Sequence, residues 1–241
     1  MAIRAVTLSE RPDLEHEFSR FHASAWPPFM LHDSISNRTW HTLHGRFSGF
    51  QVLLLADDEV VGVGNTMPVA WDGSLGDLPD GVDGVLVRTV DEGAQPTVLS
   101  AMAAMVGQAH KGRGISTLVL QRMQRLASEH GLRSLIAPVR PTLKDRYPLI
   151  AMERYMHWRR SDGSAFDPWL RVHERLGAQV LTLAERSMTI PGTISQWQEW
   201  TGMAFPETGS YVVPGALSPI EVDVERDRGV YVEQNIWMLH P

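Results

Sequence analysis

The sequence contains no cysteine, which excludes a disulfide framework, a thiolate zinc site and a cysteine nucleophile from this chain. It also has no window of 18 uncharged apolar residues, which argues against a membrane-spanning helix. Residues 1–10 lack the apolar run of a signal peptide, and this favours a cytoplasmic protein. Basic residues are the minority, with 22 Lys and Arg against 28 Asp and Glu and a net charge of −6, so nucleic acid is an unfavourable partner.

The composition is otherwise that of an ordinary globular protein, with 43% hydrophobic and 21% charged residues. A chain of 241 residues can bury a core without a metal or disulfide. We see no internal repeat, low-complexity tract or linker, and we therefore expect one domain over residues 1–241.

Hydrophobic periodicity and turn residues predict alternating helices and strands. Asp33 and Asp167 are expected N-caps, and Gly131 and Gly177 are expected helix stops. The predicted strands are 3–7, 51–56, 60–69, 96–106, 132–139 and 178–190, with a hairpin formed by 219–226 and 229–240. The uniformly apolar segment 96–106 also fits a helix. The predicted helices are 10–25, 33–47, 85–92, 115–130, 167–177 and 194–201.

The segment from Val106 to Thr117, V-G-Q-A-H-K-G-R-G-I-S-T, carries the clearest chemical signal. A buried strand enters a glycine-rich loop, and the loop opens a helix. Free N–H groups and the helix dipole at such a start favour an anion, and Lys111 and Arg113 add positive charge. The segment lacks the GK[ST] ending of a Walker loop and the three glycines of a dinucleotide fingerprint. A solvated turn is the alternative interpretation.

This segment resembles the acyl-CoA-binding motif of the GNAT superfamily, the acyl-CoA-dependent N-acyltransferases. Lys111 stands at the motif's Arg or Gln position, Gly114 at its first Gly, and Ser116 at its last small position. Residues 173–178, H-E-R-L-G-A, are similar to the family's Tyr-Glu-Lys-Leu-Gly-Phe at the end of its last core helix. The resemblance covers roughly residues 1–190.

The resemblance implies an α+β fold in three layers. It consists of a GNAT-like mixed β-sheet with helices on both faces, splayed central strands and an extra C-terminal β-hairpin. Residues 143–166 would be an insertion and about 191–241 a C-terminal extension. The co-substrate would be acetyl-CoA or another short acyl-CoA, and no metal is expected. The cofactor-binding residues would be Met105, Val106, Lys111, Gly112, Arg113, Gly114, Ile115, Ser116 and Thr117.

The implied reaction is direct attack by a small amine acceptor on the thioester. His173 stands where the family commonly has the Tyr that donates to the leaving thiolate, and Tyr147 is an alternative hydroxyl. Ser100 stands where some relatives place a Glu base, so another residue would have to take the amine proton. The candidates for that base are Glu153, His157 and His41.

Arg140 follows the strand that ends near Val139, where acceptors of this family approach. It could bind the carboxylate of an amino-acid or peptide acceptor, or be an ordinary surface or ion-paired arginine. Two other functions stay open: a GNAT-fold protein that binds acyl-CoA as a sensor or partner module, and acyl-CoA chemistry such as O-acylation or decarboxylation. The sequence also leaves a homodimer open.

Overall fold

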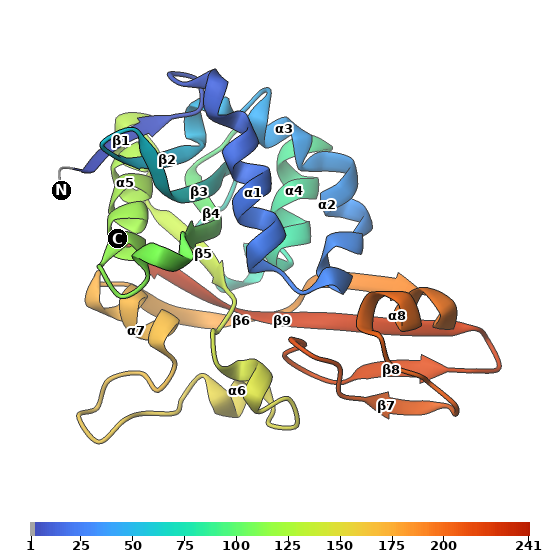
Figure 1. The fold of residues 1–241 in the computed structure, drawn as a ribbon. Helices are drawn as coiled ribbons and strands as arrows, with labels where there is room; N and C mark the ends of the chain where they lie inside the picture. The colour runs from blue at the N-terminus through green and yellow to red at the C-terminus, as the bar shows by residue number, and fades with distance from the viewer. Residues whose placement is uncertain (1–2) are drawn as a thin grey trace.

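The computed structural model describes residues 3–241, so Met1 and Ala2 of the expected domain lie outside the described residues. Within this range, nine strands form one mixed sheet (Figure 1). The order along one path is β1-β2-β3-β4-β5-β9-β8-β7, and β6 pairs with β9. The strands are β1 (Ile3–Thr7), β2 (Val52–Ala56), β3 (Glu59–Val69), β4 (Val98–Val106), β5 (Leu135–Val139), β6 (Gln179–Gly192), β7 (Gly209–Tyr211), β8 (Ile220–Asp223) and β9 (Arg228–His240).

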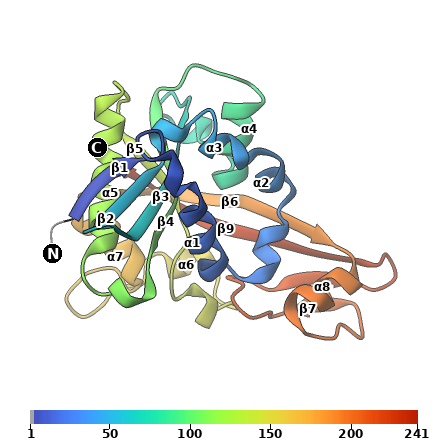
Figure 2. The same cartoon turned by 45° about the horizontal axis from the view of Figure 1, so that its top comes forward.

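Helices cover both faces of this sheet, which confirms the predicted three-layer α+β architecture (Figures 1 and 2). The four N-terminal helices lie on one face and the next three pack on the other. The helices are α1 (Glu15–Ala25), α2 (Ser34–Thr39), α3 (His41–His44), α4 (Gly81–Val90), α5 (Ile115–Glu129), α6 (Met152–Tyr155), α7 (Pro168–Arg175) and α8 (Ile194–Thr201).

The centre of the sheet separates between β4 and β5. These parallel strands pair only at Leu99 with Leu135 and at Ser100 with Ile136. Beyond that point β4 stays on β3 as far as Val106, while β5 stays on β9 as far as Val139. The backbone of β4 that faces β5 is therefore left unpaired, and the predicted splay is present.

The strand β9 is the longest of the C-terminal elements and belongs to the core. Its second half pairs with β5, from Val139 opposite Ile236 to Leu135 opposite His240. Its first residues pair with β8, which confirms the predicted hairpin. In Figure 1 the far ends of β6 and β9 extend beyond the helical layers and carry β7, β8 and α8.

Two local predictions differ from the structure. The helix expected over 33–47 is split into α2 and α3, although Asp33 does cap α2 by accepting from the Ser36 N–H. The helix expected over 85–92 begins earlier, at Gly81. Residues 143–166 contain little regular structure beyond α6, because their aromatic side chains pack on one another instead.

No helix within residues 3–241 is long and apolar enough to cross a bilayer. The same residues contain no group of three or more His, Asp or Glu side chains with the spacing of a metal site.

Candidate active site

A cleft of about 800 Å³ opens where β4 and β5 separate. Its floor and one wall come from β4, the loop before α5, the end of β5, and α7. The opposite wall comes from the end of α1, the start of α4, the middle of β6, and β9. The lining residues include Trp26, Val82, Ala101, Met102, Met105, Val106, Lys111, Gly112, Gly114, Ile115, Ser116, Thr117, Val139, Arg140, Asp145, His173, Met188, Gly215, Glu233 and Asn235.

The loop before α5 has the backbone geometry that an anion requires. Gly112 and Gly114 both have φ of +77°, a conformation that other residues rarely adopt. A Cβ atom built on either glycine would meet nothing within 4 Å, so the space beside the backbone is open. The first turn of α5 has no side-chain cap, and its N–H groups border the cleft.

These features fit an acyl-CoA. The open glycine loop and the helix start suit the pyrophosphate, and the unpaired edge of β4 at Met105 and Val106 suits the amides of the pantetheine arm. Every predicted cofactor-binding residue lines the cleft except Arg113.

No family model matches the chain. It is 34% identical over 270 residues to the arginine N-acetyltransferase avaD of Aspergillus versicolor, covering 98% of this chain and 92% of that protein. The chain belongs to the GNAT superfamily. It is an acyl-CoA-dependent N-acyltransferase whose co-substrate is acetyl-CoA or another short acyl-CoA, and it acts on a small-molecule acceptor.

Two solved structures show the same fold at low sequence identity. The loading GNATL domain of CurA from Lyngbya majuscula has a TM-score of 0.61 and 15% identity, covering 77% of this chain and 88% of that one. The GphF GNAT-like decarboxylase in complex with isobutyryl-CoA has a TM-score of 0.57 and 17% identity, covering 100% of this chain and 98% of that one.

His173 lines the cleft of this GNAT enzyme and is 1% exposed. Burial, and then the neighbouring His240, lower the pKa of His173 to about 3. The ring is therefore neutral at physiological pH, so it can donate a hydrogen bond but cannot serve as an imidazolium acid. Trp169, also in α7, packs edge-on against this ring at 4.6 Å between centroids.

Two of the predicted catalytic residues, Ser100 and Tyr147, do not line the cleft. Ser100 is fully buried and is not part of the cleft, because it still pairs with Ile136 in the last register before the strands separate. Tyr147 does not reach the cleft either, since its ring packs against Tyr155, Trp158 and Phe166. None of the suggested bases Glu153, His157 and His41 lines the cleft.

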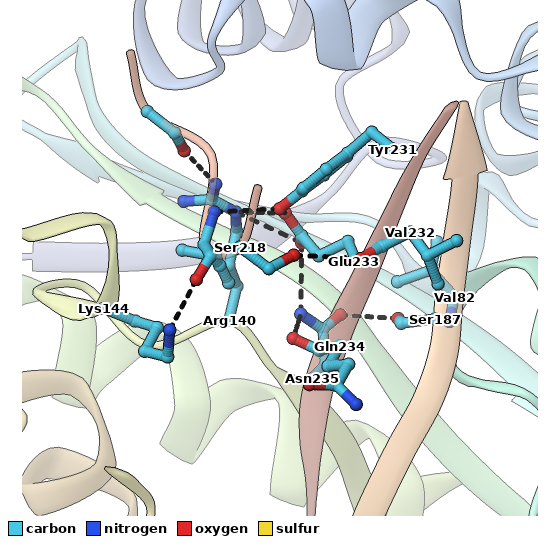
Figure 3. A network of polar contacts seen from close by, with 12 residues as sticks. Val82, Arg140, Lys144, Ser187, Ser218, Tyr231, Val232, Glu233, Gln234 and Asn235 are labelled. Atoms are coloured by element: carbon cyan, nitrogen blue, oxygen red, sulfur yellow. Dashed lines mark hydrogen bonds and ion pairs between the residues drawn. The ribbon is translucent and has the colours of Figure 1, made fainter. Parts of the chain in front are cut away.

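Arg140 is held at the cleft wall by a network from β9 (Figure 3). Its Nε donates to both carboxylate oxygens of Glu233, at 3.2 and 3.0 Å, and its Nη2 donates to the Gly215 carbonyl. Tyr231 Oη and Asn235 Nδ2 donate to the same carboxylate. Burial by itself would lower the pKa of Arg140, but the charge of Glu233, the neighbouring Tyr231 and the hydrogen bond to Glu233 together exceed it, so the net shift of the pKa is upward.

Sequence reasoning missed this network. Tyr231, Glu233 and Asn235 alternate along β9 and are all buried, while Val232 and Gln234 between them are half-buried. The available signal was this alternation, which puts Glu233 and Asn235 on the same face of the strand as Tyr231. Charged residues are rarely buried without partners, so a Glu on that face indicates a buried partner.

A second buried acidic group lies behind the cleft wall. Asp83 Oδ2 accepts from the Thr189 N–H at 3.2 Å, while Asp83 Oδ1 and Asp33 Oδ2 have no partner among residues 3–241. Burial, and then the neighbouring Asp33 carboxylate, raise the pKa of Asp83 to about 8. The folded protein therefore keeps a proton on Asp83 at neutral pH, and that proton accounts for the two oxygens without partners.

We expect Asp83→Asn to stabilise the protein increasingly as the pH rises. An unfolded Asp ionises near pH ~4, whereas the folded pKa is about 8, so wild-type stability falls as the pH rises through this window. The Asn amide keeps an acceptor for Thr189 and a donor toward Asp33, and it does not titrate. Urea unfolding at pH 5, 7 and 9 measures the difference, with exposed Asp58→Asn as the control. A difference that does not grow with pH would contradict the raised pKa.

Proposed function

We propose that this GNAT enzyme transfers an acetyl group from acetyl-CoA to an amine of arginine or a closely related basic amino acid. The name of the 34% identical relative suggests the acceptor. The observation that carries the proposal is that Arg140 lines the cleft while its guanidinium is held by Glu233 and Gly215.

Arg140 is prepared for a carboxylate ligand. Glu233 and the Gly215 carbonyl occupy Nε and Nη2, and Nη1 has no hydrogen-bond partner within residues 3–241. The side chain is 20% exposed and lines the cleft, so Nη1 is available to an acceptor. A guanidinium fixed in this way pairs well with the carboxylate of an amino acid.

One exposed carboxylate at the cleft, that of Asp145, favours a cationic side chain on the acceptor. Asp145 is exposed and lines the cleft next to Arg140. The chain as a whole has a net charge of −6, which raises the local concentration of a basic ligand. An acceptor with a carboxylate at one end and a positive charge at the other meets both features.

Acetyl-CoA, when bound, supplies the acetyl thioester that the amine attacks. The chain's own residues bind and orient the two substrates and favour departure of the sulfur. The β4 edge and the loop hold the cofactor, Arg140 holds the acceptor, and the neutral His173 ring offers a hydrogen bond to the thiolate.

Release of CoA, measured with a set of matched acceptors, tests this function. Arginine is compared with agmatine, which lacks the carboxylate, and with citrulline, which lacks the positive charge. We expect kcat/KM to fall at least about tenfold for each analogue, since each loses one charge-assisted contact. Equal rates with arginine and agmatine would contradict the role of Arg140. No CoA release with arginine, lysine or ornithine would contradict the proposed acceptor class.

A further inference from the structure

Two buried histidines, His173 and His240, connect the cleft to α5 through hydrogen bonds. His173 Nδ1 lies 2.9 Å from His240 Nε2, and His240 Nδ1 lies 3.3 Å from the side-chain amide nitrogen of Gln124 in α5. The two rings are 1% and 0% exposed. His173 Nε2 is buried as well, and it has no partner among the described residues.

The chemistry of these groups fixes the direction of each hydrogen bond. An amide nitrogen can only donate, so His240 Nδ1 accepts and the His240 proton is on Nε2. That N–H donates to His173 Nδ1, which leaves the His173 proton on Nε2. Burial lowers the pKa of His173 to about 3 and that of His240 to about 4, so each neutral ring has a single N–H.

We propose that Gln124 and His240 are positioning residues that hold His173 in the Nε2–H tautomer, so that a neutral donor serves the thioester sulfur. This inference rests on the proposed acetyl transfer. As the N–C bond forms, the C–S bonding pair moves to sulfur, and the amine proton leaves to water. His173 keeps its proton and contributes a hydrogen bond to the thiolate, because giving the proton away would leave an imidazolate. The opposite tautomer would present a lone pair to the thiolate and repel it.

The tautomer can be measured without any substrate. Long-range ¹H–¹⁵N correlation spectra of the full chain labelled with ¹⁵N-histidine distinguish Nε2–H, Nδ1–H and imidazolium rings. We expect His173 to be neutral with its proton on Nε2 at pH 7. His22 provides an internal reference, since its Nδ1 accepts from the Trp26 indole N–H at 3.1 Å and its Nε2 faces Asn65 Oδ1 at 2.9 Å. A His173 proton on Nδ1, or an imidazolium ring, overturns the proposal.

Two substitutions of His240 separate positioning from packing. His240→Gln places an amide nitrogen where His240 Nε2 lies and can still donate to His173. His240→Leu keeps the volume and removes the donor. We expect His240→Leu to give a mixture of His173 tautomers and to lower kcat about tenfold, with the KM for acetyl-CoA within about twofold of wild type. His240→Gln is expected to restore the Nε2–H signal and most of kcat.

The hydrogen bond from Gln124 to His240 is tested by a substitution of its own, with a matched control. Gln124→Leu removes the donor to His240, and we expect the His173 signal to shift partway toward the Nδ1–H pattern. Gln121→Leu makes the same change one turn earlier on α5, and we expect it to leave both the signal and kcat unchanged. A wild-type kcat in His240→Leu overturns the positioning role. A His173 signal that stays unchanged in both His240→Leu and Gln124→Leu overturns it as well. The spectra remain informative even if arginine proves not to be the acceptor.

Discussion

Gly114→Val is expected to weaken acetyl-CoA binding by about 100-fold or more while the protein still folds. Gly114 is the N-cap of α5, with φ of +77°, and an added Cβ would meet no protein atom within 4 Å. The new side chain would therefore occupy the open space beside the helix N–H groups, where the pyrophosphate is expected to bind. A β-branched residue also resists this left-handed conformation, at a cost of about 1–2 kcal/mol.

Isothermal titration with acetyl-CoA measures this effect, and Gly131→Val is the matched control. Gly131 lies just beyond the other end of α5, with φ of +69° and no atom within 4 Å of an added Cβ. The control therefore has the same backbone strain and the same open surroundings without bordering the cleft. Wild-type affinity in a folded Gly114→Val protein would contradict the assignment of this loop to the cofactor.

Arg140→Met is expected to affect stability and acceptor binding together. Removing the guanidinium leaves the Glu233 carboxylate, which is 1% exposed, buried without its cation. Breaking one side of such a pair costs about 3–5 kcal/mol, which is a large share of the stability of a typical domain. Urea unfolding is expected to show this loss directly, and the KM for arginine is expected to rise at least about tenfold.

The double variant Arg140→Met/Glu233→Gln separates the two effects. Replacing Glu233 with neutral Gln removes the uncompensated charge, so we expect most of the lost stability to return. Arginine binding is expected to stay weak, because the ligand for the acceptor carboxylate is still absent. Acetyl-CoA affinity is expected to remain normal in both proteins. A stable double variant with the wild-type KM for arginine would show that Arg140 only balances Glu233.

The acyl-CoA half of the site was predictable because its determinants are local. A buried strand, two glycines with positive φ and the start of an uncapped helix all fall within Val98 to Thr117. Backbone sterics and unpaired N–H groups at a helix start depend on a few neighbouring residues, so the sequence pattern carries them directly. The His173 motif was found for the same reason, since it closes one short helix.

The sequence could not show that Ser100 lies outside the cleft, because counting along a strand does not say where two strands separate. Ser100 and Ala101 are neighbours in β4, yet one is buried beside β5 and the other lines the cleft. Past that boundary β5 continues to pair with β9 as far as Val139, while its pairing with β4 has ended at Ile136. The sequence could not show the packing of Tyr147 either, because its ring joins an aromatic cluster whose members meet only in the folded chain.

The sequence alone therefore determined the GNAT fold and the backbone geometry of the glycine loop, because both follow from short contiguous patterns. Only the tertiary structure decided the hydrogen-bond network of Arg140 and the protonation state of His173. Trp26, Arg140, Met188 and Glu233 are far apart in the chain and meet because β9 lies between β5 and β6. The position of the proton on His173 is likewise set by His240, which lies at the end of β9. Long-range strand pairing brings these residues together, and such pairing is specified by packing rather than by local propensity.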